Sequence, residues 1–84
     1  MPQITGTLIN PDLSPVSGVV NIQLKSNTAY LTSVAIKTIL SFRLDNTGSF
    51  SANLVPGTYQ ITLPNLSKIE VILDALDLDI KDSL

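Results

Sequence analysis

The sequence predicts an all-β protein, a small sandwich of six or seven antiparallel strands. Over most of the chain, apolar and polar residues alternate with the period of two that is typical of strands with one buried face. Clusters of Asn, Asp, Pro, Gly and Ser separate these runs at intervals of about 8 to 12 residues, a spacing typical of sandwiches and small barrels. The 84 residues suffice for one domain and leave no room for a βαβ crossover beside these strands.

Two strands are expected in the first third of the chain. Residues 3–8 alternate apolar residues with Thr and end before the turn-forming sequence Asn-Pro-Asp-Leu-Ser-Pro at 10–15. Residues 20–25 then alternate Val, Ile and Leu with Asn, Gln and Lys, which predicts a half-buried strand. The polar segment 26–33 is interpreted as a loop.

One long strand is expected over residues 34–44. A helix over residues 35–40 is the competing interpretation, but Lys37 and Arg43 fit the alternation of a strand better. The residues expected on the inner face of this strand are Ile36, Thr38, Leu40, Phe42 and Leu44.

Three further strands complete the predicted sandwich. A tight turn at 45–48, with Gly48 supplying positive φ, leads into residues 50–54. A Pro-Gly turn leads into residues 58–63, and a Pro-Asn-Leu-Ser turn leads into residues 69–73. The aromatic residues expected in the core are Phe50 and Tyr59. The sandwich domain is therefore expected to span residues 1–73.

The last segment, residues 74–84, differs in composition because it contains four aspartates and one lysine. Its apolar residues alternate with aspartates, which suits strand addition to the sheet edge of another protein. We therefore expect an acidic and apolar strap that binds a partner. The alternative is an edge strand of the same domain.

The sequence offers no residues for common enzyme chemistry. It has no His and no Cys, so that the usual general base, the usual nucleophile and the two best zinc ligands are missing, and we expect no enzyme, cofactor or metal. Asp77 and Asp79 have the alternate spacing of an EF-hand loop, but the Gly and the closing Glu of that loop are absent. The turn at 45–48 could hold a cation at its tip, but a hairpin explains its residues.

Charge and hydropathy exclude two classes of partner. Net charge is −2 and the five basic residues are scattered, so nucleic acid is not expected as a partner. No apolar run approaches the roughly 18 residues that would cross a membrane, and the first residues do not resemble a signal peptide.

Several apolar residues fall where the alternation predicts the outer face or a loop. These residues are Leu13, Val19, Ile39, Leu66 and Ile72. Together with the apolar residues of the last segment they indicate a covered surface, although loose patterning in a small sandwich is the alternative. The residues expected to form the partner interface are Leu76, Leu78, Ile80, Leu84, Ile39 and Ile72.

Three parts of the chain resemble a known family. Residues 4–8 (ITGTL) with 14–16 (SPV) and 20–25 (VNIQLK), and residues 48–59 (GSFSANLVPGTY), are similar to the N-terminal domain of phage tail fibres of the lambda side tail fibre type. The end of the chain, KDSL, is similar to the end of that domain. The family lies within the broader transthyretin-like and carboxypeptidase-regulatory sandwiches, and the resemblance implies an Ig-like, transthyretin-like, non-catalytic fold. Its domain precedes a long fibre shaft, which these 84 residues do not include.

The resemblance implies a structural protein of a tailed-phage virion, made in the host cytoplasm, that attaches tail-fibre or baseplate components by protein–protein contact. A capsid cement or decoration protein is the alternative within structural proteins. A receptor- or carbohydrate-binding module is the alternative from another class, although aromatic residues for stacking on sugars are few. The expected partners are other virion proteins and further copies of the chain, most simply in a homotrimer.

Overall fold

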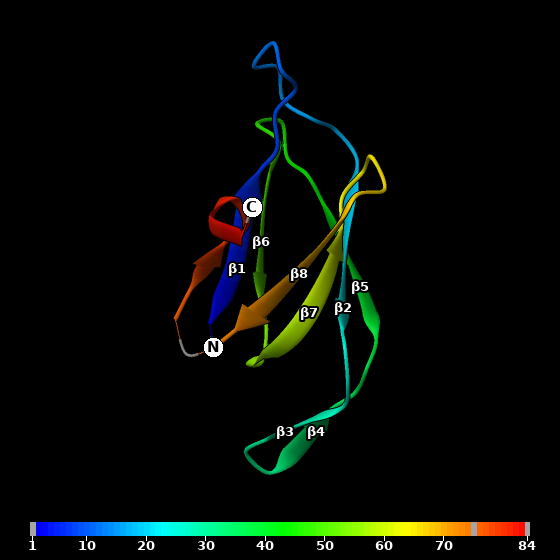
Figure 1. The fold of residues 1–84 in the computed structure, drawn as a ribbon, viewed down its shortest axis with the longest axis vertical. Helices are drawn as coiled ribbons and strands as arrows, with labels where there is room; N and C mark the ends of the chain where they lie inside the picture. Colours follow the sequence, from blue (N-terminus) through cyan, green and yellow to red (C-terminus); the bar gives the residue numbers. More distant parts are fainter. Residues whose placement is uncertain (1, 75, 84) are drawn as a thin grey trace.

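A computed structural model describes residues 2–74 and 76–83, and in this part of the chain it contains nine strands and one short 3-10 helix. Seven strands form two layers, and the other two form a separate hairpin (Figure 1). The predicted all-β sandwich is therefore confirmed.

The larger layer is a four-stranded antiparallel sheet. In spatial order its strands are β5 (Ile39–Arg43), β2 (Val19–Leu24), β7 (Gly57–Thr62) and β8 (Lys68–Leu73). In β2, β7 and β8 alternating residues bury one face and leave the other more exposed, as the period of two predicts, whereas the edge strand β5 is exposed over most of its length.

The smaller layer contains β6 (Ser49–Asn53), β1 (Gln3–Thr7) and β9 (Leu78–Asp79) in that order. β1 pairs with β6 in antiparallel fashion along its full length, and Ile4 lies opposite Ala52. β9 pairs with the other edge of β1 in parallel fashion, so that this sheet is not wholly antiparallel.

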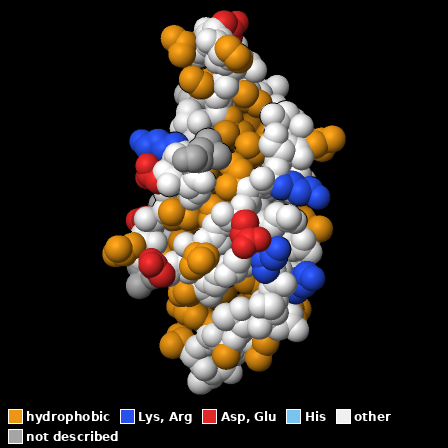
Figure 2. All heavy atoms as spheres, viewed as in Figure 1, with side chains coloured by type: hydrophobic (Ala, Val, Ile, Leu, Met, Phe, Trp, Pro, Cys, Tyr) orange, Lys and Arg blue, Asp and Glu red, His pale blue; other side chains and the backbone are white. Residues whose placement is uncertain are grey.

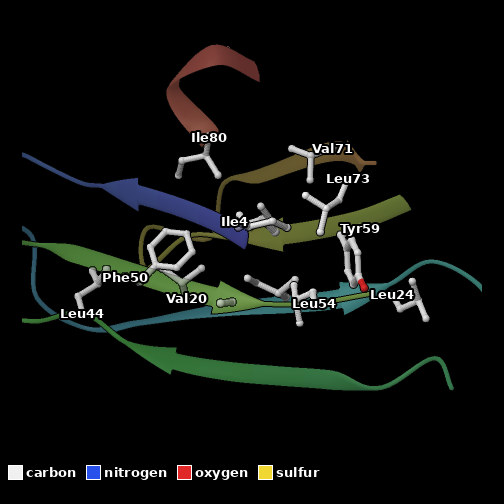
Figure 3. Packing of buried hydrophobic residues seen from close by; sticks show 13 residues of the cluster. Ile4, Val20, Leu24, Leu44, Phe50, Leu54, Tyr59, Val71, Leu73 and Ile80 are labelled. Atoms are coloured by element: carbon white, nitrogen blue, oxygen red, sulfur yellow. The ribbon is translucent and has the colours of Figure 1, made fainter. Parts of the chain in front are cut away.

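The core lies between the two layers. Figure 3 shows Ile4 and Phe50 from the smaller sheet facing Val20, Val71 and Leu73 from the larger one. Phe50 and Tyr59 are buried, as the sequence predicts. The Tyr59 hydroxyl donates a 2.6 Å hydrogen bond to the carbonyl of Val55, and burial raises the pKa of this phenol. The one polar atom of this side chain is therefore satisfied.

The predicted loop at 26–33 and the predicted long strand at 34–44 are both wrong. β3 (Thr28–Tyr30) and β4 (Ser33–Ala35) form a hairpin, and residues 36–38 separate β4 from β5. The Asn27 side chain accepts a 2.7 Å hydrogen bond from the Lys37 amide and holds the base of the hairpin together. Three of the five residues expected to point inward are consequently on the surface: Thr38 is exposed, Ile36 is 67% exposed and Leu40 is 43% exposed.

The expectation that the last segment stays outside the core is also wrong. Leu78 pairs opposite Ile4, and Ile80 in the 3-10 helix η1 (Ile80–Ser83) is only 3% exposed. Leu78 and Ile80 therefore belong to this domain, as in the edge-strand alternative, and not to a partner interface. Leu84 lies outside the described residues.

The physical reason for this correction is the missing side chain at Gly6, which leaves a space beside the smaller sheet. A Cβ at Gly6 would lie 2.6 Å from Cγ1 of Ile80 and 2.8 Å from Cε1 of Phe50. The absence of a side chain on β1 leaves a space that Ile80 fills, and the apolar area so buried stabilises the docked segment. The backbone amide of Gln3 also donates a 2.9 Å hydrogen bond to Asp77.

We predict that Ile80→Ala lowers the free energy of unfolding by about 2–5 kcal/mol, because it opens a cavity in the core. Leu76→Ala, at a 76% exposed position of the same segment, should change it by less than about 0.5 kcal/mol. Gly6→Ala alone should cost about 1–3 kcal/mol through overpacking against Ile80. Chemical denaturation of all three variants and of the double variant Gly6→Ala/Ile80→Ala measures the coupling.

In the double variant the two costs should not add, because truncating Ile80 frees the space that the added methyl group on β1 enters. Additive costs, or a stable Ile80→Ala variant, would show that the last segment does not close the core.

Candidate functional site

Three loops of the same construction lie together at one end of the sandwich, and we call this region the loop end (Figure 1). The loops are residues 10–14, 45–49 and 63–67. In each, the amide of the first residue donates to the carbonyl of the fifth, at 2.8, 3.0 and 2.8 Å. The amide of the fourth residue donates back to the carbonyl of the first, at 2.9, 3.1 and 2.8 Å. This pattern is a tight turn whose fourth residue takes the left-handed conformation.

The residue at the left-handed position differs among the loops. Loop 45–49 uses Gly48, with φ 79°, and a Cβ there would collide with the carbonyl oxygen of Leu8. The other two loops use Leu13, with φ 72°, and Leu66, with φ 70°. A leucine in this conformation is costly, by about 1–2 kcal/mol, whereas Gly has no such cost. The two leucines are also 76% and 78% exposed, so the fold does not recover this cost by burying them.

The leucine-bearing loops are well ordered by their other residues. Pro11 and Pro64 follow the first residue and fix φ in the range that this turn needs. Asp12 accepts hydrogen bonds from the amide and the hydroxyl of Ser14, at 3.1 and 2.6 Å. Both hydrogen bonds lower the pKa of the Asp12 carboxyl, and the bond from the Ser14 hydroxyl has the larger effect. Each loop therefore holds its leucine side chain in a defined place above the sandwich.

The second loop forms a comparable network around Asp45. One oxygen of this carboxylate accepts from the amide and hydroxyl of Thr47 and from the amide of Ser49, at 2.8, 2.7 and 3.0 Å. The hydroxyl of Thr47 is the main cause that lowers the pKa of Asp45. These bonds support the hairpin interpretation of the turn. Among the described residues, no group of three or more acidic, His or Cys side chains is placed to hold a metal ion.

An apolar hollow of about 420 Å³ lies between the two leucine-bearing loops. Its walls include Leu8, Ile9, Pro11, Val16, Leu63 and Pro64. Ile9 is 53% exposed there, and Figure 2 shows hydrophobic side chains on the surface at this end. The loop end thus combines two projecting leucines with a recess for an apolar group, and both are features of a protein-binding surface.

The five apolar residues that the sequence predicts on the outer face or in loops are indeed on the surface. Leu13, Val19, Ile39, Leu66 and Ile72 are all partly or largely exposed. The structure does not bring all the predicted interface residues together, however. Ile39 and Ile72 lie on the two outermost strands of the four-stranded sheet, roughly 14 Å apart at the spacing of neighbouring strands.

Leu76 is exposed in the short connection between β8 and β9, and its amide donates a 3.0 Å hydrogen bond to the Asp74 carboxylate. Of the predicted interface residues, Ile39 therefore lies on one edge strand of the four-stranded sheet, and Ile72 and Leu76 lie on or just after the opposite edge strand. Leu13 and Leu66, by contrast, share the loop end.

Sequence reasoning also missed a second group of exposed apolar residues, on the hairpin of β3 and β4. Leu31 is 89% exposed, and Val34 and Ile36 are each 67% exposed. The turn of this hairpin has no Gly or Asn at its left-handed position, where Leu31 has φ 54°, so that the usual hairpin signal was absent. The run of Thr, Ala, Tyr and Val was the only sign of strands there.

Comparison with known proteins found no matching family model and no significantly similar curated protein. No helix in the described part of the chain is long and apolar enough to cross a membrane.

We predict that replacing the leucines by Gly, in Leu13→Gly and Leu66→Gly, leaves the isolated protein at least as stable as the wild type. Each change removes a left-handed cost of about 1–2 kcal/mol and adds a cost of about 0.4–1 kcal/mol from the greater freedom of Gly in the unfolded chain. Gly48→Ala, the reverse change in loop 45–49, should cost at least about 1 kcal/mol. Thermal and denaturant unfolding of the three variants measures these changes. If the Leu→Gly variants were less stable than the wild type, the leucines would have a stabilising role in the isolated protein, and the prediction would be wrong.

Proposed function

We propose that this protein is a non-enzymatic structural protein of a tailed-phage virion, which attaches tail-fibre or baseplate components by protein–protein contact at its loop end. The observation that carries the proposal is the pair of leucines held exposed at left-handed positions, Leu13 and Leu66. Such strain persists where another role requires it, and an exposed leucine beside an apolar hollow gains most of its burial energy in a complex.

Two further arguments support a structural role in a virion. The sequence resembles the N-terminal domain of phage tail fibres in its first strands and in residues 48–59. The chain has no His and no Cys, which leaves the most common catalytic side chains unavailable. We propose other virion proteins as partners and a homotrimer as the assembled form, since fibre components commonly have cyclic symmetry.

Immunogold electron microscopy of the tailed phage particles whose genome encodes the chain tests this proposal. We expect the label at the tail fibres or the baseplate. Label on the capsid would instead favour a capsid cement or decoration protein, and particles without the protein would refute a virion role.

The double variant Leu13→Gly/Leu66→Gly should fold but enter particles at least about tenfold less, because two contact leucines are lost. The control is Leu76→Ala, which removes a leucine of equal exposure, 76% for both Leu13 and Leu76, at a different place. Normal incorporation of the loop-end variant, measured by quantitative mass spectrometry of purified particles, would contradict binding at the loop end.

A further inference from the structure

One side of the sandwich is left open, because four strands of the larger sheet face only three strands of the smaller sheet. On the opposite side, η1 follows β9 and contacts β8, so the outermost strands of both layers meet there. On the open side the outermost strands are β5 and β6, which are joined by loop 45–49 (Figure 1). The smaller sheet ends at β6 and has no strand that covers β5.

The inner face of β5 is consequently exposed. Leu40 pairs opposite Ile22, and paired residues of neighbouring strands point to the same face of a sheet. Ile22 is 1% exposed, whereas Leu40 is 43% exposed. No residue of β5 is fully buried, and only Phe42 packs partly against the core. The larger sheet therefore presents apolar surface that its own smaller sheet does not reach.

The open side contains two hollows, each lined by residues on or beside β5 and β6. The first is an apolar groove of about 360 Å³, and its walls include Leu40, Asn53 and Leu54. The walls of the second, beside loop 45–49, include Arg43 and Ser51. A segment laid along the free edge of β6 passes both hollows.

The free edge of β6 has backbone groups without a partner. On its other edge, the Leu54 amide donates a 3.1 Å hydrogen bond to the carbonyl of the residue before β1. Because residues of an antiparallel strand direct N–H and C=O alternately to its two sides, the odd-numbered residues of β6 face away from β1. Ser49 is bonded there to Asp45 through both its amide and its carbonyl, each at 3.0 Å. Within residues 2–74 and 76–83, the backbone groups of Ser51 and Asn53 have no hydrogen-bond partner on that side.

β6 is also the edge strand with the least protection. Sheet edges are commonly protected by charged side chains, by Pro or by short length. β8 carries Lys68 and Glu70, β5 carries Arg43, and β9 has two residues. The five residues of β6 include no charged residue and no Pro. A regular, uncharged edge beside an apolar groove has the features of a site for strand addition.

These features select a single extended protein segment as the occupant. Unpaired N–H and C=O groups that recur every second residue match the repeat of another strand, and its alternate side chains would face the groove. A second copy of the sandwich does not fit through its own edge strands, because its other sheet would meet β5 in the layer below. The occupant therefore brings one strand and no second layer.

We propose that the free edge of β6 binds an extended segment of a different protein, which adds a fourth strand to the smaller sheet. Apolar residues at alternate positions of this segment cover Leu40 and fill the groove. Lys37, Arg43 and Asp45 border the open side, two positive charges against one negative charge, which favours a segment with acidic rather than basic ends. This site is separate from the loop end, and it does not rest on a role in a virion.

A tethered strand tests whether the edge accepts such a segment. Pro2 lies beside Leu54, so a strand fused before the N-terminus can reach the free edge of β6. A linker of about twelve Gly and Ser residues spans roughly 20 Å and permits either strand direction. The test strand is Glu-Val-Thr-Val-Thr-Val-Glu, and the control is Glu-Ser-Thr-Ser-Thr-Ser-Glu, which lacks the apolar side chains.

Amide hydrogen exchange, measured by NMR, is the readout. In the unextended chain, the amides of Ser51 and Asn53 should exchange faster than those of Phe50 and Ala52, which face β1. The test strand should slow exchange at Ser51 and Asn53 by at least about tenfold, and the control strand should not. Unchanged exchange with the test strand, or equal slowing by both strands, would overturn the inference.

Two variants of the extended chain locate the contact. Ser51→Pro removes an amide on the free edge and no hydrogen bond to β1, so the fold is retained and the slowing at Asn53 should be lost. Ser51→Ala keeps the amide and should keep the slowing. Leu40→Ser removes the apolar side chain from the exposed face of β5 and should reduce the slowing by several-fold. Slowing that persists in both Ser51→Pro and Leu40→Ser would place the added strand elsewhere and overturn the inference.

The identity of the partner is tested in the unextended chain. If a second copy occupied the edge, exchange at Ser51 and Asn53 would slow as the protein concentration rises, and this result would overturn the assignment to a different protein. Exchange that is independent of concentration supports the assignment. None of these measurements depends on where the protein lies in a particle, so this inference and the proposed function can fail separately.

Discussion

Through the contact between Ile80 and Gly6, the first strand and the last segment of the chain pack into the same core. Without Ile80 and β9, β1 would pair with β6 alone, and a two-stranded layer is too small to cover the inner face of the four-stranded sheet. The missing side chain at Gly6 makes the space, and Ile80 fills it from a segment that follows the larger sheet. A small domain buries a limited share of its surface, so one well-packed isoleucine is a large part of its stability.

The closed core has a consequence for the two ends of the molecule. Because the two sheets are held together by their shared buried face, the tips of the loops and of the hairpin of β3 and β4 need not be buried, and only residues at their bases, such as Leu63 and Ala35, pack against the core. The loop end carries leucines in ordered turns, and the hairpin of β3 and β4 carries exposed apolar side chains. Both ends of the sandwich therefore display exposed apolar side chains, on elements of different construction.

The loops also show how one turn geometry serves two purposes. Loop 45–49 has Gly48 at the left-handed position, which is the least strained choice, and Asp45 satisfies its amides. Loops 10–14 and 63–67 keep the same hydrogen bonds but place a leucine where Gly is preferred. The comparison within one chain separates the backbone requirement, which all three loops meet, from the exposed side chain, which only two of them display.

The sequence by itself determined the faces of β1, β2, β6, β7 and β8, because alternation with a period of two is a local property of each strand. It also determined the turns at 10–14, 45–49 and 63–67, since Pro, Asp, Asn and Gly act on their own neighbours. Local pattern was not enough for residues 26–44, where the hairpin of β3 and β4 interrupts an alternation that is typical of one strand.

Only the tertiary structure decided where the last segment lies and which exposed residues meet. The alternation of residues around Ile80 is the same whether the last segment is a free strap or packs on its own domain. Which of the two forms depends on the space beside Gly6, a residue far from Ile80 in the sequence. Leu13 and Leu66 lie at the same end of the sandwich because β1 and β7 both finish there, whereas Ile39 and Ile72 are held apart by the two strands between them. Such contacts follow from the order of strands in the sheets, which the alternation within any one strand does not encode.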